Sequence, residues 1–400
     1  MTGQIVITGT GIVSAIGNNM AETVSSLCSE KTGVGILRHL NTTHKEFPVG
    51  EVKMSDDDMK RLLHISDEPT TRTALMGMLA IKEALEAASL LGREGLNIAL
   101  VSGTTVGGMD KTEQYYQDYL VNDSRNEYIK THDCGATTEM MADYFGGFSL
   151  VTSISTACSS AANAIIMGAN LIRGGIVDIA VVGGAECLTK FHLNGFNSLM
   201  ILDHEQCKPF DACRAGLNLG EGASFIVMET AESAQKRGVH AMAVLSGYGN
   251  ASDAYHQTAS SDQGDGAFLS MQKALDMAGL QPEDIDYINA HGTGTPNNDM
   301  SESHALLRVF GEHMPLVSST KGMTGHTTSA SGAVETTICL MALQHGIVPV
   351  NYGWKTPMEN GIVPSMSVNA EKPLRHIMCN SFGFGGNDSS LIISRYDHEQ

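Results

Sequence analysis

Short apolar runs alternate with longer amphipathic stretches along this chain of 400 residues. The runs are rich in β-branched residues, as strands are, whereas the stretches repeat their apolar residues at the spacing of a helix face. The alternation favours a layered α/β architecture whose central strands are mostly parallel. The predicted strands are 4–10, 97–104, 149–154, 178–185, 223–230, 242–249, 285–292, 316–322 and 390–396, and the predicted helices are 70–91, 161–173, 266–279, 299–310 and 330–345.

Parts of the first half of the chain are echoed in the second half. Residues 154–177 and 317–348 both contain a strand, a Ser-Thr pair, a turn of small residues and a helix that ends at glycine before Ile-Val. Residues 6–17 and 244–256 both run from a strand into Gly-x-Gly. We interpret these echoes as two copies of one α/β unit that meet near residue 240.

Composition and charge narrow the classes of function. The chain is 42% hydrophobic and 17% charged, which is typical of a globular enzyme. Its net charge of −19 argues against nucleic acids and anionic membrane surfaces as partners. No apolar run approaches the roughly 18 residues of a membrane span, and the first residues do not resemble an export signal. Eight cysteines without Cys-x-x-Cys or zinc-like spacing therefore predict a reduced, cytoplasmic protein.

One cysteine lies at the junction of a predicted strand and a predicted helix, in the stretch STACSSAANAI (155–165). At the start of a helix, Cys158 would face unpaired backbone N–H groups that favour its thiolate form. Its small neighbours would leave room for a substrate. A buried core cysteine is the alternative, and this stretch alone leaves both interpretations open.

Two histidines also follow predicted strands, inside turns rich in glycine and threonine. NAHGTGTP (289–296) contains His291, and TKGMTGH (320–326) contains Lys321 and His326. A lone histidine is usually a surface or core residue. A cysteine and two histidines at strand ends indicate a functional site more strongly, because ligand sites of α/β sheets gather at the carboxyl ends of strands.

Taken in this order and spacing, the motifs resemble those of the β-ketoacyl-acyl carrier protein synthases, the condensing enzymes of fatty-acid and type II polyketide synthesis. The resemblance is strongest to the elongating branch and spans essentially the whole chain. It implies a thiolase-like fold, in which two duplicated βαβαβαββ halves form a five-layered αβαβα arrangement. The halves would be 1–240, carrying the cysteine, and 241–400, carrying the two histidines. The motifs that carry the resemblance are 6–17, 183–186, 251–256, 289–296, 318–326, 332–335 and 380–386.

The resemblance assigns a role to each catalytic candidate. Cys158 would accept an acyl chain from an acyl carrier protein. His291 and His326 would hold the thioester oxygen of a malonyl unit while decarboxylation generates the carbanion that attacks the acyl-cysteine. Lys321 would keep both imidazoles neutral by charge repulsion, and Glu335 would pair with Lys321. The resemblance implies no metal and no cofactor beyond the phosphopantetheine of the carrier.

The resemblance also implies binding roles for residues around the catalytic group. A homodimer is expected, or a heterodimer with a chain-length factor. Many bacterial elongating enzymes have an arginine where this chain has Met200, so the usual carrier contact is not expected there. The implied roles are an oxyanion hole from the backbone of Cys158 and Phe384; a gate of Phe384, Gly383 and Gly385 with a mobile loop from Asp253 to residue 266; pantetheine binding by Thr293 and Thr295; an acyl pocket of Val106, Met109 and Phe196; carrier contacts from Lys60 and Arg61; and an extension of the lysine network by Asp299 and Glu302.

Plainer interpretations stay open for these binding residues. The threonines could stabilise a turn, the pocket residues and Phe384 could be core, and the basic pair and the two acids could be solvated helix surface.

Rival functions also remain. A chain-length factor shares the fold but generally lacks the cysteine, a thiolase would act on coenzyme A thioesters, and a cysteine hydrolase would not need the second histidine. The stretch around Cys158 resembles polyketide-type enzymes more than those of housekeeping fatty-acid synthesis.

Overall fold

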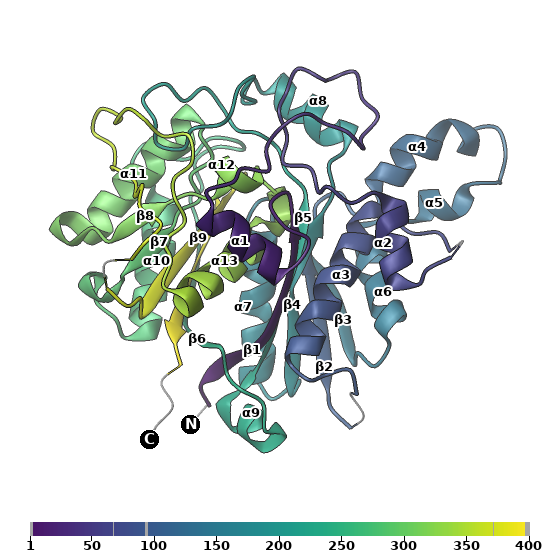
Figure 1. Cartoon of the computed structure of the whole chain (residues 1–400), viewed down its shortest axis with the longest axis horizontal. Coiled ribbons are helices and arrows are strands. Elements are labelled where there is room, and N and C mark those ends of the chain that lie inside the picture. The colour runs from purple at the N-terminus through teal and green to yellow at the C-terminus, as the bar shows by residue number, and fades with distance from the viewer. Residues whose placement is uncertain (1–2, 67, 93–94, 371, 397–400) are drawn as a thin grey trace.

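The computed structural model describes residues 3–66, 68–92, 95–370 and 372–396. Within these residues ten strands form one mixed sheet in the order β3-β2-β4-β5-β1-β6-β10-β9-β7-β8 (Figure 1). The strands are β1 (Ile5–Ser14), β2 (Ile98–Gly103), β3 (Leu150–Ile154), β4 (Ile179–Glu186), β5 (Gly222–Thr230), β6 (Ala243–Ser252), β7 (Tyr287–Asn289), β8 (Leu316–Ser318), β9 (His376–Gly383) and β10 (Asn387–Arg395).

The two halves of the sheet repeat one strand order. From one edge of the sheet to its middle, the order in the first half is β3-β2-β4-β5-β1. From the opposite edge to the middle, the order in the second half is β8-β7-β9-β10-β6. Each strand of the first half therefore has a counterpart five strands later in the chain at the same place in the other half. The halves join where β1 pairs with β6, at Val6–Val244 and Ile7–Ala243. Both sequence echoes therefore fall on equivalent elements, β1 with β6 and β3 with β8. The exact division at residue 240 stays a prediction.

The prediction of mostly parallel central strands is wrong. Parallel pairing is confined to the two outer triplets, β3-β2-β4 and β9-β7-β8, whereas every pair between β4 and β9 is antiparallel. A parallel connection needs a crossover of a dozen or more residues. Only three residues, 384–386, separate β9 from β10, so this pair must be a hairpin.

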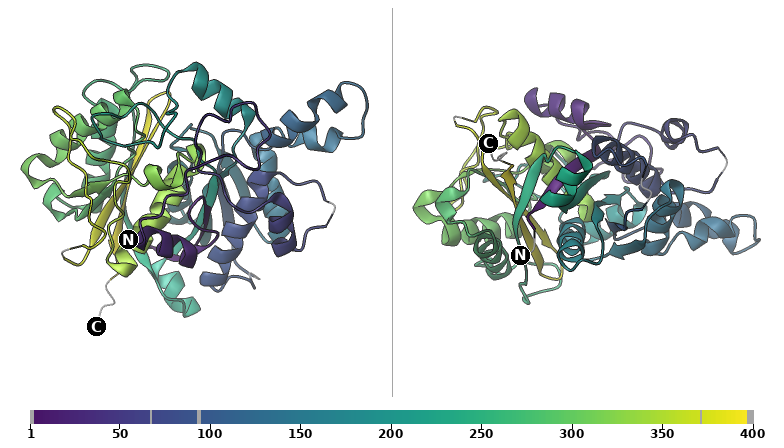
Figure 2. Two further views of the ribbon diagram at one scale, coloured as in Figure 1. Left: turned by 45° about the horizontal axis from the view of Figure 1, so that its top comes forward. Right: turned by 90° about the horizontal axis from the view of Figure 1, so that it is seen from below.

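Helices lie in three layers around the two half-sheets. Helices α7 and α13 pack against each other between the halves, α3 and α6 cover the outer face of the first half, and α10 and α11 cover that of the second (Figures 1 and 2). The arrangement has the five αβαβα layers that the resemblance implied. The helices are α1 (Met20–Cys28), α2 (Asp56–Leu63), α3 (Arg72–Ala87), α4 (Met109–Tyr119), α5 (Asn126–Lys130), α6 (Cys134–Phe145), α7 (Ser160–Arg173), α8 (Lys190–Ser198), α9 (Ala231–Arg237), α10 (Asp265–Ala278), α11 (Pro296–Phe310), α12 (Lys321–Thr324) and α13 (Ser331–His345), with short 3-10 turns at Pro282–Asp284, Gly311–His313 and Thr328–Ala330.

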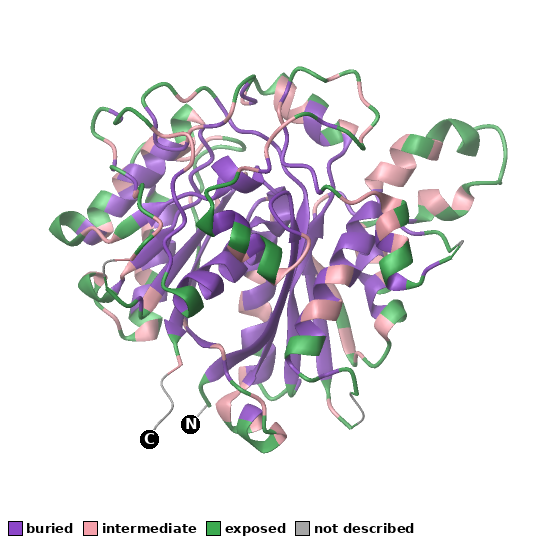
Figure 3. Cartoon of the chain, viewed as in Figure 1, coloured by how far each residue is buried: buried purple, intermediate pink, exposed green. Residues whose placement is uncertain are grey.

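The central layer is largely buried (Figure 3). Every residue of α13 from Ser331 to Leu343 is buried, because this helix has a half-sheet on either side. Its first turn lies close to α7, and a Cβ placed on Gly332 would come within 2.6 Å of the backbone nitrogen of Ala162. Glycine at this position therefore allows the two helices to approach near their N-termini. No helix in the described ranges is long and apolar enough to cross a membrane.

Candidate active site

Cys158 lies in the turn that joins β3 to α7. The helix begins at Ser160, so the thiol precedes the first turn rather than forming part of it as predicted. Ala157 has a φ of 51°, a left-handed conformation that is uncommon for a residue other than glycine. Such strained residues concentrate at functional sites. Cys158 itself is only 5% exposed.

The thiol is held in its neutral form. Burial raises the pKa of Cys158 to about 11, although the backbone N–H of Phe384 and the positive charge of Lys321 act in the opposite direction. The expectation that the helix start favours a thiolate is therefore wrong for the resting protein, because loss of solvation outweighs the nearby N–H groups. A base must take the proton when the sulfur reacts.

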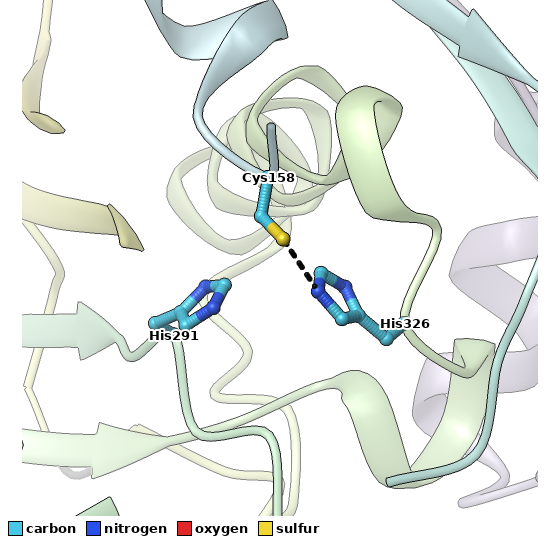
Figure 4. A group of neighbouring side chains, drawn as sticks. All are labelled: Cys158, His291 and His326. Atoms are coloured by element: carbon cyan, nitrogen blue, oxygen red, sulfur yellow. Dashed lines mark hydrogen bonds between the residues drawn. The ribbon is translucent and has the colours of Figure 1, made fainter. Parts of the chain in front are cut away.

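Two buried imidazoles lie beside the thiol (Figure 4). Nε2 of His326 is 3.1 Å from Sγ of Cys158, and its Nδ1 is 3.0 Å from the hydroxyl of Ser331. The ring of His291 meets that of His326 edge to face, with centroids 5.3 Å apart. Nδ1 of His291 has no hydrogen-bond partner among the described residues. The thiol and the two imidazoles thus form one buried group.

Both imidazoles are neutral. Burial first, and then the charge of Lys321, holds the pKa of His291 and of His326 well below 6.5. Lys321, at the start of α12, is 1% exposed and forms a salt bridge with Glu335 of α13. Burial raises the pKa of Glu335 to about 7 in spite of this partner. The effect of Lys321 on the imidazoles has the predicted sign, but burial is the larger cause.

Two carboxylates of α11 hold the loop that carries His291. Glu302 accepts hydrogen bonds from the backbone N–H of His291 and Gly292, at 2.8 and 2.7 Å. Asp299 accepts from the N–H of Gly294 at 3.1 Å. Both acids are at most 1% exposed, so they are not a solvated helix start. They fix the backbone on which His291 is carried.

A cavity of about 300 Å³ opens above the thiol and the two imidazoles. The predicted residues Thr293, Thr295, Phe196 and Phe384 line it. The two threonine hydroxyls lie 2.8 Å apart. The cavity is lined by Cys158, His291 and His326 together with Phe196, Ile201, Leu217, Thr258, Ala259, Ser260, Thr293, Thr295, Pro296, Asn297, Asn298, Phe382, Gly383, Phe384, Gly385 and Gly386.

The other two predicted pocket residues, Val106 and Met109, do not line this cavity. Val106 lies 2% exposed in the turn after β2, where its N–H donates to the carboxylate of Glu186 at 3.1 Å. The same carboxylate accepts from the hydroxyl of Ser329, in the turn that follows His326. Met109 is the first residue of α4. Their assignment to an acyl pocket stays a prediction.

The two predicted gate segments are hydrogen-bonded to each other. The N–H of Gly385 donates to the carbonyl of Gln257, and that of Asp253 donates to the carbonyl of Gly386, both at 2.8 Å. The ring of Phe384 is half-buried and stacks on Phe196, with centroids 5.8 Å apart. A movement of either segment must therefore break contacts with the other.

A buried acidic side chain, Asp388, follows the Gly383–Gly386 turn. Asp388 is 6% exposed, and burial raises its pKa to about 8, with further repulsion from Asp253 and Glu302. Asp388 is therefore protonated at neutral pH.

The predicted carrier contacts lie apart from the cavity. Lys60 and Arg61 belong to α2, which packs against α3 on the flank of the molecule (Figure 1). Arg61 forms an ion pair with Asp58. Met200 is 86% exposed just after α8, next to the cavity residue Ile201. A carrier footprint on Lys60 and Arg61 stays a prediction.

The cysteine and the two histidines are also a conceivable metal site, since their ligand atoms lie within 4.8 Å of one another. The sulfur and nitrogen ligands on a tetrahedral zinc ion are about 3.5 Å apart, which follows from Zn–S and Zn–N bonds of about 2.3 and 2.0 Å. The direct 3.1 Å contact of Cys158 with His326 is shorter than that. The charge of Lys321 opposes a further cation. The prediction that the site takes no metal remains a prediction.

Sequence reasoning missed several residues of the site. Ser331, which contacts His326, lies in an unremarkable polar run. Phe382 packs its ring against that of His291 and lines the cavity. Asn387 accepts hydrogen bonds from the side chains of Ser159, Asn163 and Asn250, and so ties the turn after β9 to the turn of Cys158. Of these, Phe382 and Asn387 had a signal, because Phe382 lies within the motif 380–386 and Asn387 directly follows it.

Comparison with known proteins gives matches over the whole chain. Residues 2–234 match the model of the beta-ketoacyl synthase N-terminal domain, and 242–355 match that of the C-terminal domain. The chain is 32% identical to 3-oxoacyl-[acyl-carrier-protein] synthase 2 of Vibrio cholerae, over 98% of this chain and 99% of that protein. It is 33% identical to nodulation protein E of Rhizobium meliloti, over 99% and 100% of the two chains.

Solved structures agree with these matches. The ishigamide ketosynthase/chain length factor has a TM-score of 0.90 at 29% identity, over 99% of this chain and 100% of that chain. A ketosynthase from Xenorhabdus doucetiae, in complex with its chain length factor, has a TM-score of 0.86 at 31% identity, over 98% of both chains.

Proposed function

Because the chain belongs to the β-ketoacyl synthase family, a family of condensing enzymes with a thiolase-like fold, we propose that it catalyses a decarboxylative Claisen condensation. An acyl group held on Cys158 would be joined to malonyl-acyl carrier protein to give 3-oxoacyl-acyl carrier protein. The observation that carries this proposal is the grouping of a buried thiol and two neutral imidazoles within 4.8 Å at one cavity.

The first step transfers the acyl chain. Sγ of Cys158 attacks the carrier thioester while Nε2 of His326, 3.1 Å away, accepts the thiol proton. The C–S bond to the carrier breaks, and the carrier thiolate leaves with that proton. The N–H of Phe384, which already acts on the sulfur, lies where it can stabilise the oxyanion of the tetrahedral intermediate together with the N–H of Cys158.

The second step uses the imidazoles as donors. The bond from the malonyl carbon to its carboxylate breaks, CO2 leaves, and the electron pair becomes an enolate on the thioester. Neutral His291 and His326 stabilise the enolate oxygen by donating N–H. The hydroxyl of Ser331 can donate or accept, so it is compatible with either tautomer of His326. The enolate carbon then attacks the acyl-cysteine, and the bond to Sγ breaks with its electron pair left on sulfur. The Cys158 thiolate takes up one proton from water, which restores the resting thiol.

We further propose that the protein works as a dimer. The edge strand β3 has an exposed Val151, and α4 with the residues after it exposes Tyr116, Tyr119, Leu120 and Val121. Apolar residues gathered on a projecting element indicate an interface. The partner would be a second copy, or a chain-length factor like those in the two solved complexes. Assignment to fatty-acid or polyketide synthesis, and a cytoplasmic location, remain predictions.

Product mass tests the function. The protein is mixed with an acyl-carrier and malonyl-carrier protein, and the products are weighed. We expect a 3-oxoacyl carrier that is two carbons longer than the starter. A free acid would indicate a hydrolase, activity only on coenzyme A thioesters would indicate a thiolase, and the absence of product would indicate a non-catalytic partner subunit. A free acid, or activity only on coenzyme A thioesters, overturns the proposal. The absence of any product from the protein in its purified oligomer also overturns it.

A further inference from the structure

Helix α8 is capped from another part of the chain. The first turn of a helix leaves backbone N–H groups without partners inside the helix. Here the N–H of Lys190 donates to Oε2 of Glu113 at 2.9 Å, and that of Phe191 donates to Oε1 at 2.7 Å. The N–H of His192 donates to the hydroxyl of the N-cap residue Thr189 at 3.0 Å. Glu113 belongs to α4, so one side chain fixes the start of α8 to a distant element.

The helix that Glu113 holds is one wall of the acyl cavity. Phe196 of α8 lines the cavity and stacks on Phe384, and Ile201 lines it just after the helix. His192, 5% exposed, packs edge-on against Phe196 with ring centroids 6.1 Å apart. A shift or rotation of α8 therefore moves Phe196 and changes the space beside Cys158.

The start of α4, which carries Glu113, is itself held in place. Lys111 of α4 forms ion pairs with Asp56 of α2 at 3.0 Å and with Asp110 at 3.4 Å, and its side chain is 15% exposed. Glu113 thus projects from a helix end that is tied to the body of the protein, while the far part of α4 extends outward (Figure 2). The carboxylate has a defined position from which to hold α8.

We propose that Glu113 is a positioning residue that sets the acyl-chain selectivity of the cavity through α8 and Phe196. The inference rests on the proposed function, because it concerns which acyl groups are loaded on Cys158. A carboxylate suits this role for two reasons. Its two oxygens accept two N–H groups at once, and its negative charge is favoured at the positive end of the helix dipole.

The test measures selectivity rather than rate alone. Native protein, Glu113→Ala and Glu113→Gln are each incubated with a series of acyl-carrier proteins whose chains lengthen by two carbons, and acylation of Cys158 is followed by intact mass. Glu86→Ala is the matched control, since Glu86 is an exposed glutamate of α3, outside the proposed interface, with no side-chain hydrogen bond among the described residues. Thermal melting of each variant accompanies the kinetics.

We expect Glu113→Ala to change the ratio of acylation rates between neighbouring chain lengths by at least about threefold. This change is smaller than the full discrimination that a well-packed pocket gives for one missing methylene. Glu113→Gln keeps one acceptor and should fall between Ala and native. Glu86→Ala should match native. An equal loss of rate for all chains, with a lower melting temperature, would show a merely structural role and overturn the inference. If native Cys158 took up no acyl chain, the proposed function itself would fail.

Discussion

At the scale of single residues, the contact between Cys158 and His326 carries the chemistry. The resting thiol is neutral, since its pKa is raised to about 11, and the imidazole beside it is a neutral base. The types of these residues could be predicted from the sequence, because Cys158 follows a strand among small residues and His326 follows a strand in a glycine-containing turn. Their ionisation could not, because it depends on burial by residues remote in sequence, and the predicted thiolate was wrong for that reason.

The roles of the thiol and of the imidazoles can be separated by substitution. Cys158→Gln should abolish condensation but keep malonyl decarboxylation, because an amide fills the acyl site while the histidines still stabilise the enolate. His291→Ala or His326→Ala should lower decarboxylation by a factor of about 10² to 10³, the usual cost of one oxyanion donor. Release of CO2 from malonyl-carrier protein measures decarboxylation in the cysteine variant and in the two histidine variants. Decarboxylation at the native rate by either histidine variant would refute the assignment of that residue.

The neutral imidazoles also predict how decarboxylation depends on pH. Because burial and the charge of Lys321 hold the pKa of each well below 6.5, loss of the neutral donor forms is displaced to a lower pH than for an ordinary histidine. The pH profile of CO2 release by Cys158→Gln should then lack a tenfold fall centred near pH 6.5. A histidine with an ordinary pKa of about 6.5 would be about 90% protonated at pH 5.5, and the rate would fall about tenfold. Such a fall, with the fold intact by circular dichroism, would contradict the buried electrostatics described here.

At the scale of elements, the hairpin β9–β10 brings its turn to the thiol. The sequence showed this turn only as a glycine-rich motif and missed β9, because the strand carries buried polar residues such as Asn380 and Ser381. The side chain of Asn380 accepts from the hydroxyl of Ser390 on β10 and donates to the sulfur of Met271 on α10, and these partners cannot be inferred from local pattern. Helices such as α4 and α8 were missed because they are short or polar, although they position parts of the site.

The turn between these strands is where a gate can be tested. Phe384 is half-buried and stacks on Phe196, so its removal should widen the cavity without emptying a core site. Phe384→Ala should slow condensation more than acylation of Cys158 and reduce discrimination between chain lengths. Phe310→Ala is the control for loss of core packing, since Phe310 is 2% exposed and does not line the cavity, and it should cost about 3–5 kcal/mol of stability. A comparable loss in Phe384→Ala with unchanged selectivity would leave no support for a gate.

At the scale of the whole molecule, duplication explains how the site is assembled. The first half supplies Cys158 after β3, and the second supplies His291 after β7 and His326 after β8, strands that occupy repeated positions in the two half-sheets. The sequence echoes predicted this duplication. The antiparallel centre of the sheet was not predicted, because strand alternation with helices says little about the direction in which the last strands of each half return.

The most direct test of the account follows one acyl chain through one turnover. Cys158 is loaded with an isotopically labelled acyl group from a carrier protein, unreacted carrier is removed, and malonyl-carrier protein is added. We predict that the label leaves Cys158 and appears in a 3-oxoacyl carrier two carbons longer, with one CO2 released for each product. Label recovered as free acid, or label retained on Cys158 while CO2 is released, would contradict the account.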